Sequence, residues 1–197
     1  PAQITQLQTL LTGPTVGPAQ VDSVAELRTL LQSAAELNAL NTIAQYAQTN
    51  TGTAPTLVDF TAAGITGVTA QNIGAVQSAL ASTAITGTQA DTRQEVQAIV
   101  NAYTQILAEA NGAAADATPG VDPTAATYLA IGATTAASLS GSALQLLNSS
   151  LGNLAPTAVD TVAKIEALVK TAIGFDQNRG DQVQVTNMQF KIGRAHV

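Results

Sequence analysis

The chain has 197 residues, and its 13 Asp and Glu outnumber its seven Lys and Arg, which gives a formal net charge of −6. Charged residues make up only 10% of it, against roughly 25% in an average soluble domain. So few bases cannot form the positively charged face that nucleic acids require. The absence of cysteine excludes disulfides, thiolate nucleophiles and cysteine-ligated zinc.

No segment resembles a membrane span or a signal peptide. The longest apolar run, Tyr128 to Ala133, is far shorter than the ~18 residues that suggest a span. The chain begins at Pro1 without a basic region or an apolar core behind it. We expect it to be a fragment of a longer protein.

A repeat of about 69 residues organises the chain. Similar ten-residue segments begin at Asp22, at Asp91 and at Asp160, which lie 69 positions apart. Further pieces keep the register, since Ile4, Leu7, Gln8 and Leu11 correspond to Ile73, Val76, Gln77 and Leu80. The predicted divisions are the end of a preceding repeat (1–21), two modules (22–90 and 91–159), a third copy that merges into a different segment (160–191), and an artefactual tail (192–197).

Each module is predicted to begin with a long helix. Ser23 with Glu26, and Thr92 with Glu95, have the spacing of a capping box, whereas the third copy has Lys164 at the Glu position. Behind these caps, apolar residues recur at helical spacing and predict one buried stripe per helix. The stripes are Val24, Leu27, Leu30, Leu31, Leu37, Leu40, Ile43 and Ala47 in the first copy, and Val96, Ile99, Val100, Tyr103, Ile106, Leu107 and Ala110 in the second.

Two shorter helices are predicted to follow in each module. We expect the long helices to stop at Asn50–Gly52 and at Asn111–Gly112. The second helices then run from Pro55 to Gly64 and from Asp122 to Gly132, with Pro in the first turn. Third helices carry Ile73, Val76 and Leu80, or Leu144, Leu147 and Leu151. The predicted fold is therefore all-α, a tandem array of three-helix modules.

The stretches Thr53 to Ile73, Asp91 to Gly112 and Asp122 to Tyr128 resemble the Ala/Thr-rich helical tandem repeats of very large bacterial surface proteins. This resemblance covers about residues 1–165. It implies a non-enzymatic, adhesin-like spacer at the cell surface or outside the cell, whose partners are neighbouring repeats and an unidentified surface or host ligand. It implies no catalytic residues, cofactor or metal.

The C-terminal segment differs in charge and in pattern. Residues 1–159 hold nine acids and two bases, whereas residues 160–197 hold four acids and five bases. Ile165 to Asp176 and Arg179 to Phe190 resemble the end of the ring-building domain of the flagellar M-ring protein, which implies a helix followed by a strand. The alternative function is therefore a fragment of a flagellar basal-body ring that assembles as a homo-oligomer.

We predict that a join of two unrelated sequences explains this change, within the short stretch Ile165 to Val169 that fits both patterns. The last residues, Ile192 to Val197, resemble a translated sequencing adapter, so His196 is not interpreted as a functional residue. Sequencing the codons for residues 160–175 in the source DNA tests the join.

The polar residues favour structural roles over chemical ones. Asp22, Glu26, Asp91 and Glu95 fit helix starts better than acid/base pairs. Asn111, Asp116 and Asp122 lack the ligand spacing of a calcium loop. Arg179-Gly180-Asp181 spells an integrin-binding tripeptide, but the M-ring resemblance already accounts for it. Gly64 to Gly67 is interpreted as a capping turn and not a phosphate loop. We therefore predict no catalytic, cofactor or metal residues.

Overall fold

The computed structural model describes residues 8–9, 12, 23–112 and 122–172. Helices are the regular elements of these ranges, and no strand occurs in them, which confirms the all-α class for this part of the chain. The C-terminal strand predicted after Arg179 lies outside the described residues, as does the tail 192–197. The α-helices are α2 (Val24–Thr49), α3 (Leu57–Ala62), α4 (Ile73–Leu80), α5 (Arg93–Glu109), α6 (Ala125–Ala130), α7 (Thr134–Ala137), α8 (Gly141–Gly152) and α9 (Val162–Ala172), and η2 (Gly87–Gln89) and η3 (Pro156–Ala158) are 3₁₀-helices.

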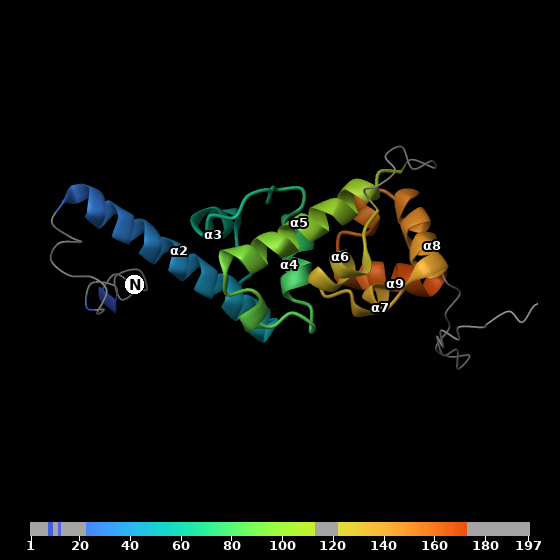
Figure 1. Cartoon of the computed structure of the whole chain (residues 1–197), viewed down its shortest axis with the longest axis horizontal. Coiled ribbons are helices and arrows are strands. Elements are labelled where there is room, and N and C mark those ends of the chain that lie inside the picture. The colour runs from blue at the N-terminus through green and yellow to red at the C-terminus, as the bar shows by residue number, and fades with distance from the viewer. Residues whose placement is uncertain (1–7, 10–11, 13–22, 113–121, 173–197) are drawn as a thin grey trace, which may run out of the picture.

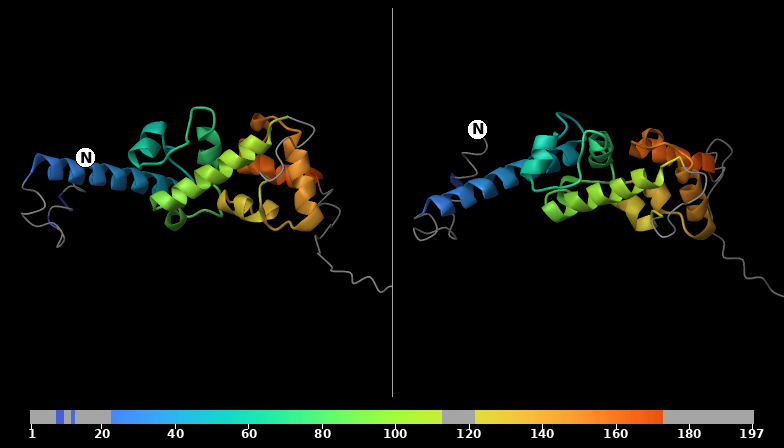
Figure 2. Two further views of the ribbon diagram at one scale, coloured as in Figure 1. Left: turned by 45° about the horizontal axis from the view of Figure 1, so that its top comes forward. Right: turned by 90° about the horizontal axis from the view of Figure 1, so that it is seen from above.

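The molecule is elongated, with α2 projecting from one end and α6 to α9 gathered at the other (Figure 1). α5 runs through the middle and contacts both α4 and α6. The two further views in Figure 2 show the same order, because α2 extends beyond the packed body in each of them. α9 returns to the body and contacts α8, α7 and α4.

Capping boxes start the two long helices as predicted, and they also start two short helices for which no box was predicted. The boxes at Ser23 and Thr92 are present, with reciprocal bonds to the Glu three residues on. Thr56 and Thr124 also cap α3 and α6. The predicted helix starts at Pro55 and Asp122 are therefore wrong, because the first helical residues follow these threonines, and Pro55 and Pro123 precede the caps instead of lying in the first turn.

The third copy replaces the broken box with an ion pair. The Lys164 ammonium donates to Thr157 O at 2.8 Å and to Asp160 Oδ1 at 2.6 Å. Thr161 still accepts from the Lys164 amide at 3.3 Å. The lysine therefore removes only the reciprocal half of the box and ties the start of α9 to the loop before it.

The helix ends use left-handed residues where the chain must turn sharply. Asn50 ends α2 with a φ of 54°, as predicted. α5 ends at Glu109, two residues before the predicted stop at Asn111. Gly132 has a φ of 77°, and a Cβ there would collide with the Ser82 hydroxyl, which donates to Gly132 O at 3.2 Å. This glycine therefore permits a close approach between the loop after α4 and the loop after α6.

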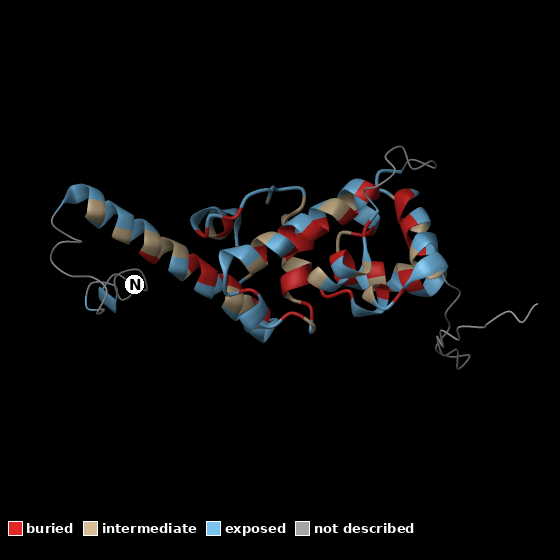
Figure 3. Ribbon diagram, in the orientation of Figure 1, coloured by how far each residue is buried: buried red, intermediate tan, exposed pale blue. Residues whose placement is uncertain are grey.

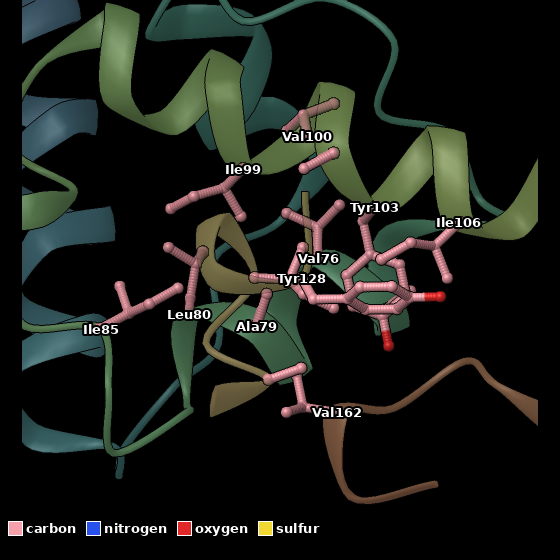
Figure 4. Close-up of a cluster of buried hydrophobic side chains, with 14 of the residues drawn as sticks. Val76, Ala79, Leu80, Ile85, Ile99, Val100, Tyr103, Ile106, Tyr128 and Val162 are labelled. Atoms are coloured by element: carbon pink, nitrogen blue, oxygen red, sulfur yellow. The ribbon is translucent and has the colours of Figure 1, made fainter. Parts of the chain in front are cut away.

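One continuous hydrophobic core joins all of these helices (Figure 3). Its largest fully buried side chains include Tyr103, Tyr128 and Phe60. Figure 4 shows residues of α4, α5, α6 and α9 meeting around the two tyrosines. Burying each such side chain contributes about 1.5–3 kcal/mol, so this cluster is the main source of stability.

The tyrosine hydroxyls find partners inside the core. Tyr103 donates to Val159 O at 3.1 Å, and Tyr128 donates to Asn148 Oδ1 at 2.8 Å. Asn148 in turn donates to Pro123 O at 2.9 Å. These bonds connect α5 to the turn before α9 and α6 to α8, and they satisfy polar groups that would otherwise be costly to bury.

The first predicted stripe is wrong over its first half. Val24, Leu27 and Leu31 of α2 are 70%, 41% and 48% exposed, and Leu37 is also exposed, whereas Val96, Ile99 and Val100 of α5 are buried. The two helices differ because α5 has a packing partner, α4, whereas no described element covers the first half of α2 (Figure 3). The later part of the stripe, Leu40, Ile43 and Ala47, is buried as predicted.

Many contacts recur at a spacing of 68 or 69 residues. Gln97 Oε1 accepts from the Thr66 amide and Glu166 Oε1 accepts from the Thr135 amide, both at 2.9 Å. The Ile65 amide donates to Phe60 O at 2.9 Å, as the Ala133 amide does to Tyr128 O at 3.0 Å. The segment 91–159 nevertheless has four α-helices in its described part where we predicted three, because α7 forms in the turn after α6.

Exchanging the amide and the carboxylate at Gln97 and Glu166 tests the recurring contact. Gln97 also donates to Thr66 O at 3.0 Å and to Asn101 Oδ1 at 2.9 Å, whereas Glu166 Oε2 is buried without a partner. We expect Glu166→Gln to raise the free energy of unfolding in urea by about 0.5–1.5 kcal/mol, because the new amide nitrogen can donate to Thr135 O, as Gln97 donates to Thr66 O, where the carboxylate oxygen has no partner. The matched Gln97→Glu should lower it by about 1–3 kcal/mol. Equal effects of both substitutions would contradict this contact.

The buried tyrosines predict alkaline unfolding. Burial, with a smaller effect of the Asp160 charge, raises the pKa of Tyr103 far above its ordinary value of 10.0. Burial and then the charges of Glu109 and Asp122 do the same to the pKa of Tyr128. The unfolded chain therefore loses these protons first, so stability is complete below about pH 10 and falls as the pH rises further. Absorbance at 295 nm should increase together with loss of the helical circular dichroism signal, and tyrosinate formation with the helices intact would contradict this burial.

Candidate functional site

The acidic residues at the helix starts act on the backbone. Glu26 Oε2 accepts from the Ser23 amide at 2.9 Å, and Glu95 Oε2 accepts from the Thr92 hydroxyl at 2.7 Å. This bond from the Thr92 side chain is the main cause that holds the pKa of Glu95 below its usual value. Asp91 is exposed beside it, and Asp22 lies outside the described residues. A carboxylate held ionised at a helix start is suited to capping and not to proton transfer.

The structure describes two of the three residues that were weighed for calcium binding. Asn111 and Asp122 are exposed at the two ends of the segment 113–121, and Asp116 lies within that segment, outside the described residues. Within residues 23–112 and 122–172, no group of three His, Cys, Asp or Glu side chains is placed to hold a metal ion. Arg179-Gly180-Asp181 and His196 also lie outside the described part.

Two apolar surfaces remain exposed, and the sequence analysis identified neither. The first is the α2 face, formed by Val24, Leu27, Leu30 and Leu31. Its leucines are on the predicted stripe, so periodicity identified the residues but not their exposure. Hydrophobic side chains gathered on one side of a helix favour a packing partner over solvent.

The second surface is the α5–α6 groove, an open hollow of about 300 Å³. Its apolar lining comes from the loop after α4, from α5 and from α6, and Gln89 and Glu95 supply its polar atoms. The apolar residues are Ile85, Ala98, Ile99, Ala126, Leu129 and Ala130. Leu129 is 60% exposed although its neighbour Tyr128 is fully buried. The only signal in the sequence is this adjacent pair of large side chains, which point to opposite sides of a short helix.

Neither surface offers chemistry beyond non-covalent contact. Their side chains are aliphatic apart from Gln89 and from Glu95, which is already engaged in its cap. None of the helices in the described ranges is both long enough and apolar enough to span a membrane.

Comparison with known proteins identifies a family whose model matches most of the chain. The family described as "Flagellar M-ring protein C-terminal" matches residues 19–190. No curated protein and no solved structure matches the chain. The match begins before α2 and continues beyond α9, so it includes both surfaces and all of the described helices.

This finding overturns the main functional prediction. The prediction of a spacer in a bacterial surface adhesin is wrong, because the family match runs through the repeat region on which it was based. The alternative, a fragment of a flagellar M-ring protein, is the one that the match supports. Ala- and Thr-rich helical periodicity is shared by many helical proteins, so the resemblance to surface repeats was not specific.

The match also extends the M-ring resemblance well beyond the segment that suggested it. We based that resemblance on Ile165 to Phe190, whereas the family match starts at residue 19. Its range includes residues 160–175, where we predicted a join of unrelated sequences. Because it covers most of the 197 residues, the chain belongs to the family of flagellar M-ring protein C-terminal domains.

Proposed function

We propose that the chain is a non-catalytic structural part of a flagellar M-ring and that it works in the basal body by packing against further copies of itself. The observation that carries this proposal is the family match over residues 19–190. A ring is a closed assembly of repeated contacts between subunits, so such a part needs surfaces for non-covalent association.

The composition supports association through apolar and uncharged contacts. Charged residues are 10% of the chain, and ion pairs join Arg93 to Glu36 and Lys164 to Asp160. Both pairs are largely exposed and contribute little to stability. A surface with so few charges imposes little desolvation cost when two copies approach.

We further propose a tandem organisation, with units at 22–90 and 91–159 and the start of a third unit at 160. The recurring contacts support it: α4 packs on α5 as α8 packs on α9, and α3 contacts α2 as α6 contacts α5. η2 at Gly87–Gln89 and η3 at Pro156–Ala158 are also 69 residues apart. Since one core joins the units, they are linked by packing and not by flexible connections.

The α5–α6 groove is the surface we propose for the neighbouring copy. It combines an apolar lining with the Leu129 side chain, which is 60% exposed. An apolar side chain beside an apolar hollow suits contact between copies, because the buried centre of homodimer interfaces is more apolar than the rest of the protein surface.

Substituting Leu129 tests the proposed ring contact. We expect the purified chain to form larger species as its concentration rises in analytical ultracentrifugation, with ring views in negative-stain electron microscopy. Leu129→Asp should shift this association to at least about tenfold higher concentration, because it places a charge in an apolar contact. The side chain is exposed in the single chain, so the fold should be retained.

Leu146→Asp is the matched control, because Leu146 of α8 is 48% exposed but does not line the groove. It should associate like the parent chain. A parent chain that stays monomeric at every concentration would contradict the proposed assembly, and equal effects of both substitutions would contradict the choice of groove.

A further inference from the structure

The α2 face is exposed where its counterparts on α5 and α9 are buried. At the 69-residue spacing, Leu27 corresponds to Val96 and Ile165, and Leu31 corresponds to Val100 and Val169. The four counterparts are at most 1% exposed, whereas Leu27 and Leu31 are 41% and 48% exposed. These two positions are therefore apolar in all three helices, but their side chains are buried only in α5 and α9.

The cover in those two copies is the third helix of the preceding unit. α4 contacts α5 through Val76 and Leu80, which lie beside Ile99 and Val100 in Figure 4. α8 contacts α9, and its Leu147 and Leu151 are fully buried. Both third helices are already packed in this way, and Leu27 and Leu31 of α2 remain exposed.

One segment of the chain has the sequence of a third helix and precedes α2. Residues 4–11 align with residues 73–80 of α4 at the same spacing, and Ile4, Gln8 and Leu11 are identical to Ile73, Gln77 and Leu80. Leu7 stands where α4 has Val76, a fully buried side chain. The apolar positions that hold α4 on α5 are therefore present again.

The connection to the next helix has the same length in both places. Residues 12–22 lie between this segment and the Ser23 cap, and residues 81–91 lie between α4 and the Thr92 cap. Each connection has 11 residues. The tether that lets α4 reach α5 is thus long enough for residues 4–11 to reach α2.

We propose that residues 4–11 dock on the α2 face in the way that α4 docks on α5, with Leu7 and Leu11 packed against Leu27 and Leu31. This inference rests on the tandem organisation proposed above and does not depend on ring assembly. The docking buries the apolar half of α2 within its own chain, which leaves the α5–α6 groove as the exposed apolar surface for a second copy.

Hydrogen exchange of the full chain tests the docking. We expect the backbone amides of residues 27–34 to exchange about tenfold or more slowly in the parent chain than in Leu7→Asp/Leu11→Asp, because losing two buried leucines opens the helix end. Amides of α5 should exchange equally in both and show that the rest of the fold is intact.

The matched control is Leu146→Asp, which places a charge on an exposed side chain of α8, at the opposite end of the molecule from α2 (Figure 1). It should exchange like the parent chain at residues 27–34. Equal exchange in the parent and in Leu7→Asp/Leu11→Asp would overturn the proposal. Protection of residues 27–34 that disappears on dilution would also overturn it, since a second copy would then be the cover; neither result would alter the test of the groove with Leu129→Asp.

Discussion

The packing of α4 onto α5, and of α8 onto α9, is the contact on which the rest of this structure depends. α4 covers the apolar face of α5, and α8 with α7 covers that of α9. α5 and α9 bury apolar side chains against these neighbours, and this burial contributes much of their stability. Because α5 also contacts α6, it belongs to the core on both sides, and the two halves become a single cluster instead of separate bundles.

The same contact explains where the structure is open. At α2, the described chain provides no third helix, so leucines that are core residues elsewhere face outward. Along α5 and α6, the chain leaves an apolar hollow because α6 is short and places Tyr128 inward and Leu129 outward. In the proposed assembly, the second of these openings lies between subunits of the ring.

Local features of the fold could be predicted from the sequence, and relations between distant segments could not. The caps at Ser23 and Thr92 depend on four consecutive residues, so the pattern was sufficient. The burial of Leu27 was predicted wrongly, because periodicity shows which side of a helix is apolar but not whether a neighbour covers it. Leu129 was missed for the same reason. The family was indicated by the segment after Ile165 and obscured by the repeats, whose alanine- and threonine-rich pattern is common to many helical proteins.

The most direct test of this account is nuclear magnetic resonance of the methyl-labelled chain, with nuclear Overhauser effects measured between methyl groups. The account predicts cross-peaks that connect α4 methyls to α5 methyls, and a corresponding set that connects α8 methyls to α9 methyls. Cross-peaks at one of these junctions without the other, or at neither, would contradict the claim that one packing arrangement is used twice to build a continuous core.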